Sequence, residues 1–263
     1  RAGHMHILQY ARSAPLHSKV YDADNNVPTF EGAPGVGCRW DEQACRGAVQ
    51  GGHLEVLQWL RGAAPPCPWY SSELCDIAAA VGSLPLLQYL RDNGCSWSTE
   101  TTRVAAQFGH LNLLRYMVLS PNHLQFDKTL CASAAFEGHL HILQFARSKE
   151  VDSKAVWDEG TCAWAAQSGK LEVLRWMRGV SEVDGNILPE AEICPWDYMT
   201  TYTAAVMGHL EVLKFARSCE NGAVPCPWAT SVYTDAEERG HDHVCRWIRA
   251  QEDPGLSIER ERE

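Results

Sequence analysis

One ten-residue phrase recurs eight times along this chain of 263 residues and limits what it can fold into. The copies read GHMHILQYAR at 3, GHLEVLQWLR at 52, GSLPLLQYLR at 82, GHLNLLRYMV at 109, GHLHILQFAR at 138, GKLEVLRWMR at 169, GHLEVLKFAR at 208 and GHDHVCRWIR at 240. Self-similarity of this kind is typical of proteins in which each repeat is one small motif that packs on its neighbours. We therefore expect a solenoid rather than a globular domain with a single central core.

The phrase itself predicts a helix, called helix B here. Counting from its glycine, position +5 is leucine in seven copies, position +7 is always aromatic, and positions +2, +4 and +8 are mostly apolar. That spacing gives a wide apolar face, as in a helix packed on more than one side. Position +9 is arginine in seven copies, which we interpret as a partner for the free carbonyls at the helix C-terminus.

A second, smaller helix, called helix A, precedes each glycine from Gly52 onward. The residue four before the glycine is always alanine, and the residue seven before it is small or a thiol in six of the seven repeats. Alanine allows helices to approach closely, and glycine accepts the left-handed backbone that ends a helix. Each repeat is therefore predicted to be helix A, a glycine turn and helix B.

An aromatic residue stands about twelve residues before each of these glycines, whereas the distance from a glycine to the next aromatic varies widely. Three of the aromatics belong to the tripeptide Cys-Pro-Trp, at 67–69, 194–196 and 226–228. We interpret the tripeptide as the packed entry to helix A. Insertions should fall in exposed loops after helix B, the longest being 14–37 and 180–193.

The copies at 129–147 and 161–178 resemble the ankyrin repeat, and the resemblance extends over nearly the whole chain to about residue 250. It implies an all-α, ankyrin-like helical-hairpin solenoid of seven repeats (38–250) preceded by a half-repeat (1–13) and a loop (14–37), with a charged tail at 251–263. The usual T-P-L-H start of helix A is missing and C-P-W-type loops replace the usual finger sequence, so whether β-hairpin fingers form is left open. Because residue 1 falls inside a half-repeat, we expect the true N-terminus to lie upstream.

Eleven cysteines in a chain of this size indicate reduced thiols rather than a disulfide framework. Thiols on helix A are interpreted as small apolar filler: Cys45, Cys75, Cys131 and Cys162. Those in the loops are expected to be more exposed, which leaves a redox-sensitive thiol as the alternative: Cys38, Cys67, Cys95, Cys194 and Cys226. Their spacing does not match a zinc site, so no metal is expected.

Histidine follows the glycine in most repeats, as at His53, His110, His139, His209 and His241. A residue type that recurs at one structural place is expected to hydrogen-bond the backbone at the turn. Pairs such as His139 and His141 should point about 200° apart on a helix and so should not share a metal.

Composition excludes several other classes of function. With 33 acidic and 23 basic side chains the formal charge is −10, which disfavours nucleic-acid binding through overall charge. No apolar run approaches the roughly 18 residues that span a bilayer, and no phosphate loop, nucleophile elbow or paired-carboxylate pattern occurs. We expect an intracellular, cytoplasmic monomer with no enzymatic activity, no cofactor and no membrane or nucleic-acid partner.

The function predicted from this pattern is a protein–protein interaction scaffold. In ankyrin-like stacks the loops and helix A line the concave binding face, and aromatic and arginine side chains dominate binding hot spots. Residues at positions that vary between repeats are therefore the candidate anchors: Tyr70, Arg103, Trp164, Tyr198 and Tyr202. The alternatives are a recognition module of a larger regulatory protein, such as a ubiquitin-ligase adaptor or an enzyme with its other domain upstream, and a thiol or metal sensor.

Overall fold

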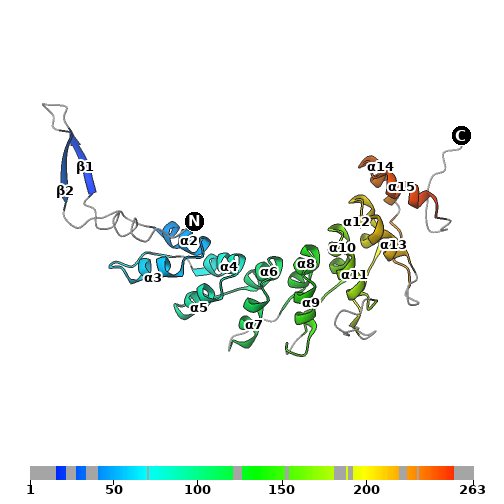
Figure 1. The fold of residues 1–263 in the computed structure, drawn as a ribbon, viewed down its shortest axis with the longest axis horizontal. Helices are drawn as coiled ribbons and strands as arrows, with labels where there is room; N and C mark the ends of the chain where they lie inside the picture. The colour runs from blue at the N-terminus through cyan, green and yellow to red at the C-terminus, as the bar shows by residue number, and fades with distance from the viewer. Residues whose placement is uncertain are drawn as a thin grey trace. The chain divides into compact units, whose positions relative to one another are not determined.

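The computed structural model describes residues 16–21, 28–33, 41–69, 71–120, 126–151, 154–180, 188, 192–218, 224–229 and 231–251 (Figure 1). The chain divides into a first part, Arg1–Trp97, and a second part, Ser98–Glu263, which are described separately. The predicted half-repeat at 1–13 and all but the first residue of the predicted tail lie outside the described residues.

The described residues of the first part form two strands and four helices. Strands β1 (Leu16–Tyr21) and β2 (Pro28–Ala33) pair antiparallel, with Leu16 opposite Ala33. Both lie inside the segment 14–37 that we expected to be a loop, so that expectation was incomplete. Val20, Tyr21, Thr29 and Phe30 are the β-branched and aromatic types that favour strands. The helices are α2 (Glu42–Gln50), α3 (Leu54–Gly62), α4 (Ser71–Val81) and α5 (Leu84–Asp92).

The second part is described as ten helices in five consecutive pairs. They are α6 (Thr99–Gln107), α7 (Leu111–Leu119), α8 (Lys128–Glu137), α9 (Leu140–Arg147), α10 (Glu159–Gln167), α11 (Leu171–Met177), α12 (Tyr198–Val206), α13 (Leu210–Arg217), α14 (Val232–Glu238) and α15 (Asp242–Arg249). Even-numbered helices are the predicted A helices and odd-numbered ones the B helices. With the two pairs of the first part, the described residues contain the seven helix pairs that the repeats predicted.

Each helix pair turns at the glycine that begins the repeated phrase. The seven glycines that separate an A helix from its B helix all have φ between 70° and 88°, as expected of left-handed backbone. The next residue's N–H bonds to the carbonyl of the alanine four before the glycine, as in His139 to Ala134 (2.8 Å) and His209 to Ala204 (2.8 Å). This is the Schellman arrangement, and it explains why glycine and alanine recur at a fixed distance.

In five of the seven described pairs, the A helix begins directly after the recurring aromatic with a polar N-cap residue: Asp41, Ser98, Asp127, Asp158 or Asp197. Asp127 and Asp197 accept hydrogen bonds from backbone N–H groups of the first turn, and Ser98 and Asp158 form capping boxes with the threonine three residues later. These caps satisfy amides that have no partner inside the helix. They define where these four A helices begin.

The core lies between successive repeats. In the second part, α6, α8, α10, α12 and α14 contact one another in order, and the B helices form a second row (Figure 1). The alanines three and four residues before the glycine are fully buried in α8, α10 and α12, so neighbouring A helices approach closely. Leucines at position +5, including Leu143, Leu174 and Leu213, are also fully buried. The helical-repeat architecture that the sequence predicted is therefore present in the described residues.

Candidate functional site

The arginine that ends most B helices holds the entry to the next A helix. Arg178 donates a hydrogen bond to the Cys194 carbonyl, and its guanidinium carbon lies 4.0 Å from the centroid of the Trp196 ring. The same pair of contacts joins Arg61 to Cys67 and Trp69, Arg147 to Ala155 and Trp157, and Arg217 to Cys226 and Trp228. Our interpretation of this arginine was therefore incomplete, because the carbonyl that it binds lies beyond the helix.

The recurring aromatic packs against a second partner in its own repeat. Its ring meets the aromatic at position +7 of helix B, with centroids 6.0–6.4 Å apart, in Trp69–Tyr89, Phe126–Phe145, Trp157–Trp176, Trp196–Phe215 and Trp228–Trp247. Four of the five pairs are edge-to-face, a favoured aromatic geometry. This confirms that Cys-Pro-Trp is the packed entry to helix A.

The loop cysteines are not exposed, contrary to our expectation. Cys67, Cys95, Cys194 and Cys226 are each 0% exposed. The thiols of three of them donate to the carbonyl of the aspartate that caps the preceding A helix: Cys67 to Asp41 (3.1 Å), Cys194 to Asp158 (3.4 Å) and Cys226 to Asp197 (2.9 Å). They are turned inward because this carbonyl lies within their reach. Cys38 lies outside the described residues.

Burial also keeps four of the described thiols protonated at neutral pH. It raises the pKa of Cys45, Cys75, Cys131 and Cys226 to about 12 each. Since the thiolate is the reactive and metal-binding form, these groups are poor nucleophiles and poor ligands at neutral pH. Among the residues that the structure describes, no three histidine, cysteine or acidic side chains are grouped so as to hold a metal ion.

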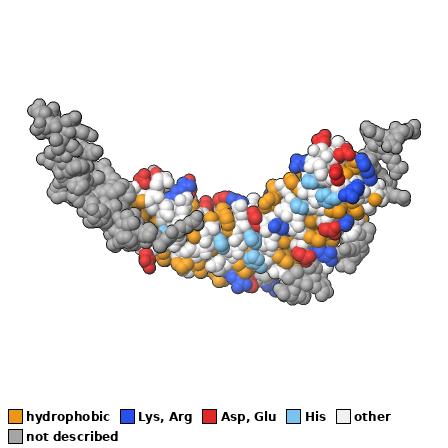
Figure 2. Space-filling model, turned by 45° about the horizontal axis from the view of Figure 1, so that its top comes forward, with side chains coloured by type: hydrophobic (Ala, Val, Ile, Leu, Met, Phe, Trp, Pro, Cys, Tyr) orange, Lys and Arg blue, Asp and Glu red, His pale blue; other side chains and the backbone are white. Residues whose placement is uncertain are grey.

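The histidines connect successive repeats, and pale blue imidazoles recur along the surface in Figure 2. The Nε2 atoms of His139, His209 and His241 lie 2.9–3.1 Å from the carbonyls of Gln107, Gln167 and Val206, which belong to the preceding A helix. For these three, the predicted backbone hydrogen bond is confirmed. The partner is the preceding repeat, so the histidine ties neighbouring repeats together.

The expected geometry of the histidine pairs was wrong. The rings of His139 and His141 lie together, with centroids 5.7 Å apart, and those of His241 and His243 are 6.1 Å apart. His139 is the N-cap residue, at φ −83° and ψ 71°, so the angle of about 200° for two positions within a helix does not apply. Both Nε2 atoms of the first pair face backbone carbonyls, since His141 lies 3.2 Å from the carbonyl oxygen of Gly109.

The structure separates the predicted anchors instead of gathering all of them. Tyr70 lies outside the described residues. Arg103 pairs on its own helix with Glu100 (2.6 Å) and Gln107 (3.0 Å). Trp164 is 46% exposed on α10 and meets the Phe136 ring of α8 edge-on at 5.9 Å.

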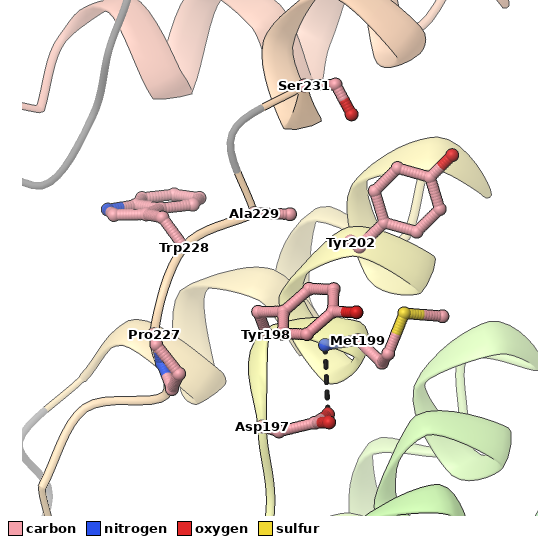
Figure 3. A pocket seen from close by; sticks show the side chains of 8 residues that line it. All are labelled: Asp197, Tyr198, Met199, Tyr202, Pro227, Trp228, Ala229 and Ser231. Carbon is pink, nitrogen blue, oxygen red and sulfur yellow. Dashed lines mark hydrogen bonds between the residues drawn. The ribbon is translucent and has the colours of Figure 1, made fainter.

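Tyr198 and Tyr202 do come together, in an open pocket of about 580 Å³ between α12 and the start of α14 (Figure 3). Its lining consists of Asp197, Tyr198, Met199, Tyr202, residues 227–229 and Ser231. In Figure 3 the Trp228 indole and the Tyr202 ring lie on either side of Ala229, with Tyr198 below them. Trp164 and Arg103 do not line this pocket.

Two carboxylates lie at the pocket and accept hydrogen bonds there. Asp197 accepts a hydrogen bond from the Met199 N–H (2.9 Å). Asp235 accepts one from Ser231 Oγ (2.7 Å), and a hydrogen bond between the Tyr202 hydroxyl and Asp235 raises the pKa of Tyr202. None of the described residues that line the pocket is a lysine or an arginine.

Sequence reasoning missed Trp228, Met199 and Ser231 as pocket residues. Trp228 recurs in the repeats and was assigned to the scaffold, although one residue can serve both roles. The sequence did hold a signal for the pocket itself: Tyr198 and Tyr202 stand four residues apart, so both rings lie on one side of a helix.

Charge is divided between the two rows of helices in the second part. The five A helices, counted with their N-cap residues, carry nine acidic and two basic side chains. The five B helices, counted in the same way, carry three acidic and eight basic ones. The row that bears the pocket is therefore the negative one.

Comparison with known proteins gives no assignment: no family model matches the chain, and no curated protein matches it. Within the described residues, none of the helices has the length and apolar character needed to span a bilayer.

Proposed function

We propose that the chain is a protein-interaction scaffold built from ankyrin-like repeats, which binds a protein partner through its A helices and the segments that precede them. The observation that carries this proposal is the exposure of large aromatic side chains on or next to A helices of the second part. Phe108 is 52% exposed, Trp164 46% and Tyr198 50%.

These side chains lie outside the contacts that recur from repeat to repeat, although Trp164 also meets the Phe136 ring of α8. The scaffold uses residues that return in all or most repeats, such as the buried alanines and the arginine–tryptophan contacts, whereas the exposed aromatics stand at positions that differ between repeats. Aromatic side chains at such positions provide large contact area and are enriched among interface hot spots.

Site-specific photo-crosslinking in a cell extract tests the proposal. A photoreactive residue replaces Trp164 or Tyr198 on A helices, or Leu119 on helix α7. Leu119 is the matched control because it is also a large hydrophobic side chain, 82% exposed, but it ends a B helix. We expect one partner to be captured from both A-helix positions and not from Leu119.

The variants Trp164→Ala and Tyr202→Ala should reduce capture of that partner, with Leu119→Ala as control. Circular dichroism of each variant checks that the helices remain folded. Capture through the B helices alone, or capture unaffected by both A-helix variants, would contradict the proposal.

A further inference from the structure

The pocket between α12 and α14 combines features that select a cation. Tyr198, Tyr202 and Trp228 contribute aromatic rings, and the faces of such rings attract ammonium and guanidinium groups through their quadrupoles. Its volume of about 580 Å³ lies in the range of pockets that enclose small ligands or side chains. The Arg217 guanidinium of the scaffold lies 4.7 Å from the Trp228 ring centroid, so an occupant of the pocket would share this ring with a structural cation.

The charges around the pocket favour the same occupant. Among the described residues that line it, Asp197 is the only charged one. Asp235 is hydrogen-bonded to the Tyr202 and Ser231 hydroxyls, and it acts on Tyr202 more strongly than the Arg239 guanidinium does. The α12 N-terminus, which would otherwise attract an anion, is already capped by Asp197. The acidic A-helix row extends the negative field beyond the pocket.

We propose that this pocket receives the cationic end of a lysine or arginine side chain from a basic segment of the partner protein. The proposal rests on the proposed function, because it names the chemistry by which the A-helix face recognises its partner. The aromatic rings enclose the cation, Asp197 supplies the opposite charge, and the methylene stem of the side chain packs against Met199 and Pro227.

Methionine-methyl NMR of the whole chain provides a direct test, because Met199 lines the pocket and the chain has only five methionines. The probes are the N-acetyl methylamides of lysine, trimethyllysine and arginine, with the norleucine and glutamate compounds as neutral and anionic controls. The Met199→Leu variant assigns the signal. We expect the cations to shift the Met199 methyl resonance at millimolar concentration, the controls to leave it in place, and added salt to weaken the response.

Three variants separate charge from aromatic contact. Asp197→Asn keeps a side chain that can cap α12 but removes the charge, and Tyr202→Leu keeps an apolar side chain but removes the ring. Each should weaken cation binding by about three- to fivefold. Arg239 lies close enough to act on the Tyr202 hydroxyl, so Arg239→Gln should strengthen binding by relieving like-charge repulsion. Glu172→Gln, on exposed α11 surface, is the matched control and should change nothing.

If the norleucine compound bound as strongly as the lysine compound, the pocket would be selecting apolar side chains and the proposal would be overturned. Preference for the glutamate compound, or no shift of Met199 with any cation up to the solubility limit, would overturn it as well. These outcomes leave the proposed function standing, because crosslinking tests that separately. Partner contacts confined to B helices would instead contradict the proposed function, whatever the titration gives.

Discussion

Replacing Arg178 by methionine should destabilise the repeats on either side of it. The arginine joins helix α11 to the entry of α12 by its hydrogen bond to the Cys194 carbonyl and by its position 4.0 Å from the Trp196 ring centroid. Methionine retains an apolar stem for packing but can make neither contact. The substitution therefore isolates what the guanidinium contributes.

The expected loss follows from these two contacts. A hydrogen bond from a charged donor contributes about 1.5–3 kcal/mol, and a half-buried cation–π contact contributes about 1 kcal/mol. Together they predict a loss of about 3 kcal/mol in the free energy of unfolding. With a urea dependence of about 2 kcal/mol/M, the midpoint should fall by about 1.5 M.

Urea unfolding followed by circular dichroism measures this shift. Arg246→Met is the matched control, because Arg246 is exposed on α15 and its hydrogen bond to the Asp242 carbonyl stays within its own helix. Arg178→Lys should give an intermediate midpoint, because lysine keeps the charge and one donor but loses the planar contact with the ring. If Arg178→Met unfolds at the same urea concentration as Arg246→Met, the contacts contribute nothing measurable and the account of the recurring arginine is wrong.

Three further predictions concern the other recurring residues. Gly169→Ala should cost at least about 1–2 kcal/mol, because φ is +70° and the new Cβ would lie 2.8 Å from the His209 ring, while Gly62→Ala, with nothing within 4 Å, should be tolerated. His209→Ala should lower the free energy of unfolding by about 1 kcal/mol, because it removes the partner of the Gln167 carbonyl. In urea unfolding, Gly169→Ala should destabilise the His209→Ala protein less than it destabilises the wild type, because the ring that its Cβ would meet is gone. Unfolded thiols ionise near pH 9, whereas burial raises the pKa of Cys131 in the folded protein to about 12, so the unfolded state binds fewer protons between these two values. The urea midpoint should therefore fall between pH 9 and 12, and more steeply in the wild type than in Cys131→Ala; equal slopes would contradict this.

The repeated helix pair could be predicted because its determinants are local. The glycine with positive φ and the alanine whose carbonyl closes the turn stand four positions apart in the sequence. Comparison of the repeated copies is therefore enough to identify both residues. Leucine at +5 lies on a helical period and was assigned to the core for the same reason.

The direction of the loop thiols could not be predicted, because it depends on contacts between repeats. Cys226 is turned inward toward the Asp197 carbonyl, which lies 29 positions earlier in the sequence. Nothing in the letters near Cys226 indicates that this carbonyl is within reach. The strand pair β1–β2 was missed for a related reason, since the strands stabilise each other and neither has a strong alternating pattern of its own.

The pocket arises where variable positions of one repeat meet the constant tryptophan of the next. The positions ten and six before the glycine carry Tyr198 and Tyr202 in α12, whereas the same positions hold Lys128 and Ala132 in α8 and Glu159 and Ala163 in α10. Only in α12 are both aromatic, so only there, among these three helices, can two rings on one helix face join the tryptophan of the following entry segment.

A recognition site of this kind requires no change in the scaffold. The contacts of Trp228 with Arg217 and Trp247 are the ones that the same position makes in other repeats, and they hold its indole in place whether or not a ligand is present. With Tyr198 and Tyr202 on the neighbouring helix α12, this structural residue becomes one wall of the pocket. Because the pocket is formed in advance by packing that the repeats already need, little further ordering of its walls would oppose binding.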